Sequence, residues 1–342
     1  MDASTVVIVT IVIALAFDVI NGFHDAANSI ATIVSTRVLS PRLAVLWAAT
    51  FNFLALWFFG EGVAKTISGI ITVDSHDHAY VWVVMCGLLG AIIWNLLTWV
   101  WGLPSSSSHA LVGGVSGAGI AYKGFGILVW KKLKLVLIFI IGAPIIGLIL
   151  GSLMMLIIAW IFRRVGPRRV DKGFRVGQLF SAAAYSIGHG GNDAQKTMGV
   201  IGMVMLAGGL VAGHQTSHGI EPDIPYWVVL ASYGCMAFGT AIGGWRIVKT
   251  MGMGLTHLKP VGGFAAEVAG AITLFTATHL KVPVSTTHTI TGAIVGVGST
   301  TNVRGIRWGL AGRIVWAWIF TIPAAGLMGY VAVKIAAAAG AW

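Results

Sequence analysis

The chain has 342 residues, of which 57% are hydrophobic and only 10% are charged, and its formal net charge is +11. An average soluble domain has about 25% charged residues, so this chain has too few to cover its surface in water. The composition excludes a soluble globular enzyme, a disordered chain and a secreted disulfide scaffold. Nucleic acid is not an expected partner, because the lysines and arginines lie in short segments between long apolar runs. We therefore expect a polytopic helical protein of the lipid bilayer.

Long apolar segments, separated by short polar ones, run through the whole chain. In chain order they are 5–34, 43–59, 79–101, 103–120, 133–162, 176–206, 226–244, 263–279, 282–298 and 314–335. Polar stretches at 21–28 and 188–196 interrupt the first and the sixth of these segments, and we expect each helix to break there. Irregular backbone at membrane depth is tolerated where it lines a cavity.

The same order of motifs occurs in each half of the chain. The first half has GFHDAAN followed by LPSSSSH, and the second half has HGGNDAQK followed by VPVSTTH. The two aspartates of these motifs, Asp25 and Asp193, are 168 residues apart. We predict a first transmembrane repeat over 1–162, a basic cytoplasmic linker over 163–175 and a second repeat over 176–342.

The distribution of basic residues predicts the orientation in the membrane. If each half makes three net crossings and its Pro-Ser/Thr-His segment returns to the side it entered, the second repeat is inverted relative to the first. With both termini outside, 14 of the 22 lysines and arginines fall in inside segments, as the positive-inside rule favours. The expected fold class is an all-α polytopic membrane protein with two inverted-topology repeats, broken helices and re-entrant Pro-Ser/Thr-His helical hairpins. This architecture is typical of secondary transporters.

Each of the two polar stretches within apolar segments contains one carboxylate. An ionisable residue such as Asp25 or Asp193 costs several kcal/mol there unless it faces a cavity or a partner. We expect both to bind a cation or a proton beside a substrate, the alternative being a hydrogen-bonded carboxylate that packs helices. Neighbouring residues add amide and imidazole groups: Asn21, His24, Asn28, Asn192 and Gln195.

Two runs of hydroxyl side chains follow Pro104 and Pro283, and proline suits the first turn of a helix. The hydroxyls are those of Ser106, Ser107, Ser108, Ser285, Thr286 and Thr287. A helix N-terminus has free N–H groups and a partial positive charge, so it favours oxyanions. We expect the two helix starts to converge on one anion, with ordinary helix capping as the alternative.

The four motifs resemble the signatures of the PiT inorganic phosphate transporter family, in order and over essentially the whole chain. The resemblance implies an inverted-repeat transporter of orthophosphate, driven by a cation gradient, in the cell inner membrane, and it leaves a homodimer open. The expected substrate-binding residues are Ser106, Ser107, Ser108, Ser285, Thr286, Thr287, Asn28, Asn192, Gln195 and Lys196. Coupling to a cation or proton is expected at Asp25, Asp193 and His24. No catalytic residue, cofactor or resident metal is expected.

The chain departs from the family's sodium-coupled pattern, G-A-N-D-x-A-N, in both halves. His24 takes the Asn position before Asp25, and Gln195 and Lys196 replace the usual Ala-Asn. These departures resemble the proton-coupled bacterial branch, which carries phosphate with or without a complexed divalent metal. Aligning the halves places Lys196 opposite Asn28, so its ammonium would stand where sodium-coupled relatives hold a cation. The alternative for Lys196 is a structural ion pair with the neighbouring aspartate.

Other functions stay open from the sequence. A sodium-coupled phosphate symporter or a sulfate permease of the same fold would use the same motifs. A membrane enzyme would need a nucleophile with a base, for which His109 and His288 are available. The hydroxyl runs are repeated symmetrically, which suits a clamp better than a single nucleophile, so we expect a transporter and not an enzyme.

Overall fold

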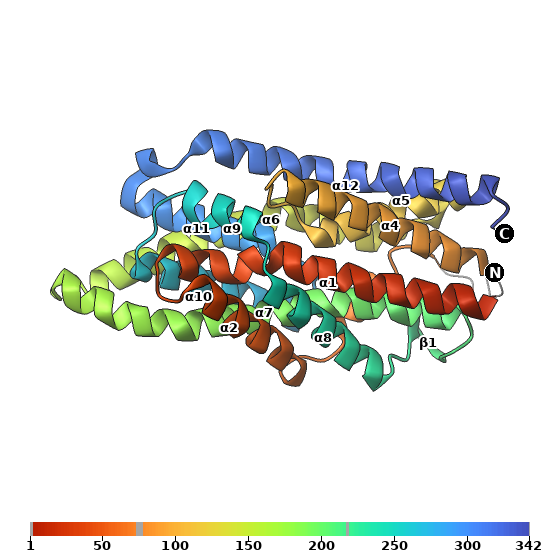
Figure 1. The fold of residues 1–342 in the computed structure, drawn as a ribbon, viewed down its shortest axis with the longest axis horizontal. Coiled ribbons are helices and arrows are strands. Elements are labelled where there is room, and N and C mark those ends of the chain that lie inside the picture. Colours follow the sequence, from red (N-terminus) through yellow and green to blue (C-terminus); the bar gives the residue numbers. More distant parts are fainter. Residues whose placement is uncertain (1–2, 73–77, 217–218, 342) are drawn as a thin grey trace.

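The computed structural model describes residues 3–72, 78–216 and 219–341, and the chain within these ranges is almost entirely helical (Figure 1). In the first half the helices are α1 Ala3–Ser35, α2 Pro41–Leu54, α3 Gly62–Ile67, α4 His78–Val100, α5 Ser107–Lys123 and α6 Trp130–Ile161. In the second half they are α7 Pro167–Ala207, α8 Tyr226–Ile242, α9 Trp245–Lys249, α10 Pro260–His279, α11 Thr286–Asn302 and α12 Trp308–Ala338. Short 3-10 turns lie at Ala55–Trp57, Phe125–Ile127 and Val303–Gly305, and a π-helical turn lies at Thr250–Gly254. A two-stranded antiparallel sheet pairs β1 Gly213–Thr216 with β2 Gly219–Pro222.

Five of the described helices are long and apolar enough to cross a membrane, namely α1, α4, α6, α10 and α12. Helix α8 and the segment Trp245–Gly254 make a sixth candidate span, bent by 61°. The bend follows Gly243, whose φ of +77° is a left-handed conformation that glycine adopts without strain. Helix α7 has 41 residues and carries HGGNDAQK within it. The fold is therefore the all-α membrane architecture that the composition predicts.

The expected breaks in two helices are absent. Helix α1 continues through 21–28, and α7 continues through 188–196. The backbone stays helical because polar side chains of both motifs find partners on other helices, as when Asn28 donates to the Thr287 hydroxyl at 2.9 Å. The irregular backbone lies elsewhere, at the bend after α8 and at the tips of two hairpins.

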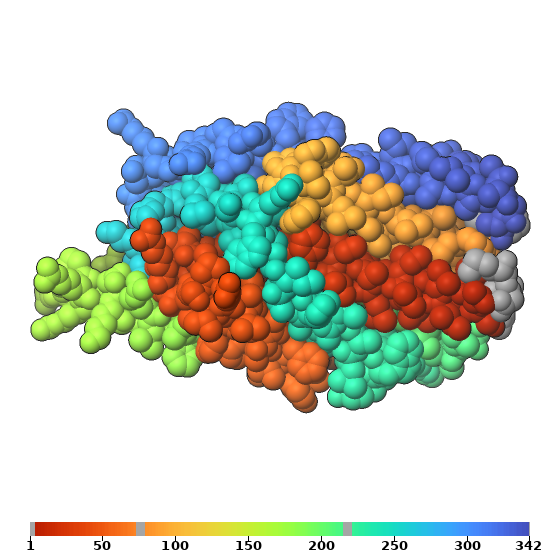
Figure 2. Space-filling view, viewed as in Figure 1, coloured from red at the N-terminus to blue at the C-terminus, as the bar shows by residue number. Residues whose placement is uncertain are grey.

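The connection between the two halves is largely helical. Helix α7 begins at Pro167, inside the segment 163–175, because proline suits the first turn of a helix. The α6–α7 connection projects from one end of the molecule, and both chain termini lie at the other end (Figures 1 and 2). The basic segment and the two termini are therefore at opposite ends of the molecule, and their orientation in the membrane stays a prediction.

Two helical hairpins enter from opposite ends of the molecule. Helices α4 and α5 occupy the half that holds both termini, and α10 and α11 occupy the opposite half (Figure 1). Non-helical tips at 101–106 and 280–285 join the two helices of each hairpin. These are the re-entrant Pro-Ser/Thr-His hairpins that the paired motifs predict, and their opposite entry is the inversion.

Each hairpin packs on the long helix that ends the other half of the chain. Helix α5 packs along α12, and α11 packs along α6. A Cβ atom at Gly117 would meet the Gly326 carbonyl oxygen at 2.0 Å, and one at Gly292 would meet the Pro144 carbonyl oxygen at 2.1 Å. Only glycine fits at either point, so the helix backbones touch directly.

The repeat extends to these two long helices. Pro144 lies inside α6 and Pro323 lies inside α12, 179 residues apart. The same interval separates Pro104 from Pro283 at the hairpin tips. In both halves, therefore, a hairpin is followed by a long helix with a proline inside it.

Large apolar side chains stay exposed along the outer faces of α6 and α12. The most exposed include Ile138, Ile141, Trp160, Leu327 and Ile335, each at least 64% exposed. Continuous apolar exposure of this kind is what helices that cross a membrane present outward, whereas a protein in water covers it.

Candidate functional site

The tips of the two hairpins meet. The imidazole rings of His109 in α5 and His288 in α11 are 4.7 Å apart, centre to centre. Trp318 of α12 stacks on His288 at 3.9 Å and donates from its indole nitrogen to the Pro104 carbonyl oxygen at 3.0 Å. One side chain thus contacts both tips and holds the two helix starts side by side.

The α1 motif contacts the first hairpin through its carboxylate. Asp25 is 2% exposed, and its Oδ1 accepts a hydrogen bond from the Ser107 hydroxyl at 3.2 Å. The Nδ1 atom of His24 lies 2.8 Å from the same oxygen. The other ring nitrogen of His24 lies 3.1 Å from the Thr98 hydroxyl of α4. The carboxylate and imidazole therefore form one buried pair, fixed by hydroxyls at both ends.

The α7 motif contacts both hairpins through a buried lysine. The Lys196 ammonium lies 2.5 Å from Asp193 Oδ1 and donates to the Ser108 hydroxyl at 2.6 Å. It also donates to the Val284 carbonyl oxygen, at the other hairpin tip, at 2.8 Å. The second oxygen of Asp193 accepts a hydrogen bond from Thr286 at 3.0 Å. The ion pair between Lys196 and Asp193, which was the alternative interpretation of Lys196, is present, and it is part of a wider network.

The network is symmetric between the halves of the chain. Asn28 of α1 donates to Thr286 at 3.3 Å and to Thr287 at 2.9 Å, so the first motif reaches the second hairpin. Lys196 of α7 reaches the first hairpin through Ser108. The hydroxyls of both helix starts and the polar groups of both motifs therefore face one shared centre.

Three groups of this centre are close enough to bind one cation together. Single ligand atoms of Asp25, His189 and Asp193 all lie within 4.8 Å of one another, and all three residues are buried. His189 lies 3.4 Å from Asp193 through Nε2, and its Nδ1 lies 3.2 Å from the Asn52 amide oxygen. Two carboxylates so close together need a proton, a cation or Lys196 to balance their charge.

Two of the six predicted hydroxyls cap their own helices. The Ser106 side chain accepts a hydrogen bond from the His109 N–H at 3.3 Å, and the Ser285 side chain accepts one from the His288 N–H at 3.2 Å. The alternative of ordinary capping therefore describes these two residues. The other four hydroxyls, those of Ser107, Ser108, Thr286 and Thr287, bond to the motifs of α1 and α7.

Asn192 and Gln195, two of the predicted substrate-binding residues, do not contact the hydroxyls at the hairpin tips in this arrangement. Asn192 donates to the Thr278 hydroxyl of α10 at 3.1 Å. Gln195 accepts from the Val63 N–H at 2.8 Å and donates to the Gly191 carbonyl oxygen at 2.7 Å. These bonds hold α10 and α3 against α7, so both side chains position helices around the centre.

Some residues of the network were not expected from the motifs. Thr98 supports His24, Asn52 supports His189, and Ser29 lies 3.4 Å from the same imidazole. Each of the three is a buried polar side chain in an apolar helix. A polar residue in such a helix is the feature of the sequence that could have indicated a contact with the motifs. Without the fold, nothing in the sequence says which motif such a residue faces.

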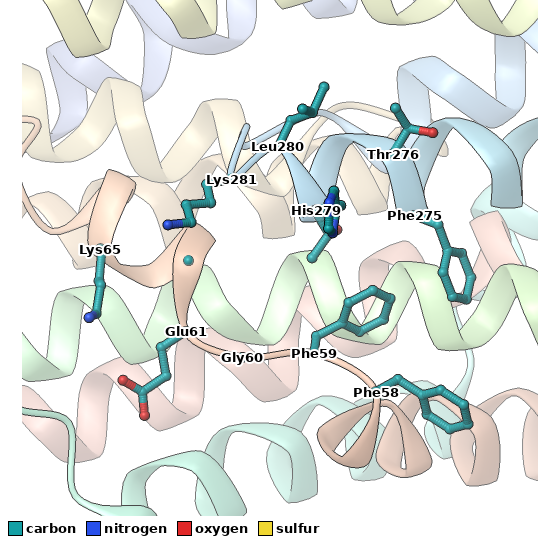
Figure 3. Close-up of a pocket in the computed structure, with 12 residues that line it drawn as sticks. Phe58, Phe59, Gly60, Glu61, Lys65, Phe275, Thr276, His279, Leu280 and Lys281 are labelled. Carbon is teal, nitrogen blue, oxygen red and sulfur yellow. The ribbon is translucent and has the colours of Figure 1, made fainter.

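A cavity of about 930 Å³ opens beside α7 (Figure 3). Phe59 packs on Gly191, where a Cβ atom would meet its ring at 2.1 Å, and the ring lies 5.1 Å from that of Phe275. Lys65, Lys281 and Glu61 also line the cavity, and the Lys65 ammonium lies 3.6 Å from the Glu221 carboxylate. The cavity therefore has charged groups of both signs at its wall.

Comparisons with known proteins point to phosphate. The family described as "Phosphate transporter family" matches residues 21–329. The chain is 53% identical over 324 residues to a "Probable low-affinity inorganic phosphate transporter" of Rhizobium meliloti (strain 1021), covering 93% of this chain and 92% of that one. It is 43% identical over 334 residues to a protein of the same description from Bacillus subtilis (strain 168), covering 97% and 98%. A solved structure described as "The sodium-dependent phosphate transporter" shares the fold, with a TM-score of 0.88 over 97% of this chain and 98% of that one, at 23% identity.

Proposed function

The chain belongs to the phosphate transporter family, and from that premise we propose that it is a secondary active symporter that couples inorganic phosphate to protons. It is a transporter and not an enzyme, as its relatives are. The observation that carries the proposal is the position of Lys196, whose ammonium contacts Asp193 and both hairpin tips.

Phosphate would bind between the two hairpin tips. The starts of α5 and α11 supply N–H groups and partial positive charge, and four hydroxyls stand at the same place. In the present arrangement those hydroxyls bond to carboxylates or to Lys196 and Asn28. An oxyanion with several acceptor oxygens would take over the donors of Ser107, Thr286 and Lys196.

The buried ammonium favours protons over sodium. Lys196 already neutralises Asp193, so a sodium ion at that carboxylate would have to displace a covalently attached cation. The remaining carboxylate, Asp25, is paired with His24, whose Nδ1 lies 2.8 Å from it. A divalent metal that travels with phosphate would find ligands in Asp25, His189 and Asp193.

The charge distribution supports an orientation in the membrane. We propose that both termini lie outside and the basic α6–α7 connection inside, as the positive-inside rule favours, in the cell inner membrane that the family resemblance implies. The homodimer that the resemblance leaves open stays a prediction.

Coupling is tested by uptake of labelled phosphate into proteoliposomes. We expect uptake to rise with an inward proton gradient and to be indifferent to the replacement of sodium by choline at constant pH. Excess sulfate should compete weakly, since it lacks a titratable proton near neutral pH. A collapse of uptake in choline would refute proton coupling and assign a sodium symporter.

Loss of one clamp hydroxyl should weaken phosphate binding in a graded way. Ser107→Ala or Thr286→Ala removes one hydrogen bond to a charged oxyanion, worth about 1.5–3 kcal/mol, so the apparent affinity should fall about ten- to hundredfold. The concentration dependence of uptake measures this. Thr301→Ala is the matched control, because that hydroxyl bonds to carbonyl oxygens of its own helix at 3.1 and 3.3 Å. An effect in only one repeat would argue against a shared site.

A further inference from the structure

A third buried carboxylate lies outside the phosphate site. Asp18 precedes Asp25 by two turns of α1, and its exposed fraction is 0%. Neither of its carboxyl oxygens accepts a hydrogen bond from any described residue. The polar side chains beside the carboxyl group are those of Thr197 in α7 and Asn21 in α1. The buried carboxyls of the phosphate site are hydrogen-bonded, so Asp18 is in a different state from Asp25 and Asp193.

Other unsatisfied polar atoms surround Asp18. The amide oxygen of Asn21, the hydroxyl of Thr197 and the hydroxyl of Tyr233 are all buried and lack a hydrogen-bond partner among the described residues. These side chains come from α1, α7 and α8, three helices that pack on one another. The titratable groups that face Asp18 are Tyr233 and Cys235 from α8, and Lys196 and Asp193 from α7.

The charge state follows from burial. An ionised carboxylate with no partner in a membrane interior costs several kcal/mol, whereas the neutral acid does not carry that cost. The neutral acid also has an O–H group, which can donate to the unsatisfied amide oxygen of Asn21. Lys196 does not balance Asp18, because its ammonium is bonded to Asp193, Ser108 and the Val284 carbonyl.

We propose that Asp18 is a proton-binding site, separate from the phosphate site, that carries the coupled proton. This inference rests on the proposed function and assigns the proton to a residue outside the motifs. Its coupling to phosphate has the sign of symport. An anion bound beside Lys196 makes the electrostatic potential at Asp18 more negative, and this favours the protonated form of Asp18. By linkage, a proton on Asp18 favours the anion equally, so the two are bound and released together.

The test separates phosphate movement from proton coupling. Purified protein in proteoliposomes is assayed for counterflow of labelled phosphate, which needs no gradient, and for accumulation driven by an inward proton gradient. A trapped pH dye reports proton entry. Asp18→Asn keeps the shape and cannot exchange a proton. We expect counterflow within about twofold of wild type, with accumulation and phosphate-dependent proton entry reduced by about tenfold or more, the size of a typical coupling between sites.

Two further variants make the result specific. Thr10→Val changes a buried hydroxyl of the same helix that bonds only to the Val6 carbonyl oxygen among described residues, and it should behave as wild type. Asp18→Glu retains a carboxyl group and should recover accumulation that Asp18→Asn loses. Failure of this recovery would count against a proton carrier.

Each remaining outcome decides a different question. Proton-driven accumulation that survives Asp18→Asn would overturn the inference, and so would an equal loss of counterflow and accumulation. Sodium-dependent uptake that Asp18→Asn abolishes would assign the same oxygens to a sodium ion instead of a proton. Absence of phosphate counterflow in wild type would overturn the proposed function itself, whatever Asp18 does.

Discussion

Replacing Asp25 by Asn is expected to abolish phosphate uptake while the protein still inserts. The carboxylate accepts the Ser107 hydroxyl at 3.2 Å and pairs with His24 at 2.8 Å, all in buried surroundings. The amide has the same shape but no charge, so the imidazole loses its partner. The two hydrogen bonds to this charged group are each worth about 1.5–3 kcal/mol, so weakening both corresponds to about a hundredfold or more in uptake rate or affinity.

The measurement is labelled phosphate uptake in proteoliposomes, normalised to the amount of inserted protein. Asp171→Asn is the matched control, because Asp171 is exposed near the start of α7 and should tolerate the loss of charge. Accumulation at the wild-type level by Asp25→Asn would show that the charged Asp25–His24 pair is not needed for transport.

Lys196→Met is expected to destabilise the carrier and to stop uptake. The ammonium is 2% exposed, and its loss leaves the Asp193 charge buried without its cation. The cost should be about 3–5 kcal/mol, seen as a lower thermal midpoint in detergent. Lys334→Met is the control, since that ammonium is only partly buried and donates to the Ala121 carbonyl oxygen at 3.1 Å.

A second substitution separates stability from transport. Adding Asp193→Asn to Lys196→Met removes both charges, so the thermal midpoint should recover while uptake stays absent. Recovery of both would mean that the pair only supports the fold, which is the structural alternative for Lys196.

The substitution Lys196→Asn tests which ion is coupled to phosphate. It restores the residue found opposite in the first repeat, which should weaken proton-driven uptake and introduce sodium dependence. Proton-driven uptake that is unchanged in this variant would contradict the account of the fixed ammonium.

The repeat and the hairpins could be predicted because they depend on recurrence. Matching motifs at a constant interval indicate the same element twice, and the long apolar segments set the spans. The predicted breaks at 21–28 and 188–196 were wrong, because the polarity of a stretch does not show whether its side chains have partners on other helices. Asn28 has one on the other hairpin, and the helix therefore continues.

The sequence was enough to predict which four motifs form the candidate site. It was not enough to predict which residues of a motif face that site. Each helical residue turns by about 100° from the last, so Lys196 lies on the same face as Asp193, three positions away. Gln195 is two positions away and lies on the opposite side, where it bonds to Val63. These relative directions hold only if α7 is continuous through 188–196, as it is in the structure. The predicted break at 188–196 therefore prevented their prediction.

Each hairpin packs on the long helix of the other half of the chain, and this has a consequence for biosynthesis. Helix α5 packs on α12, which is made much later in the chain, through contacts such as Gly117 on Gly326. Until α12 is made, Gly117 of the first hairpin lacks this backbone contact, and until α7 is made the Ser108 hydroxyl at its tip lacks Lys196. The first hairpin must therefore stay in the bilayer with these surfaces uncovered while the second half is synthesised. Neither half made alone has these contacts, and the two halves made together should assemble.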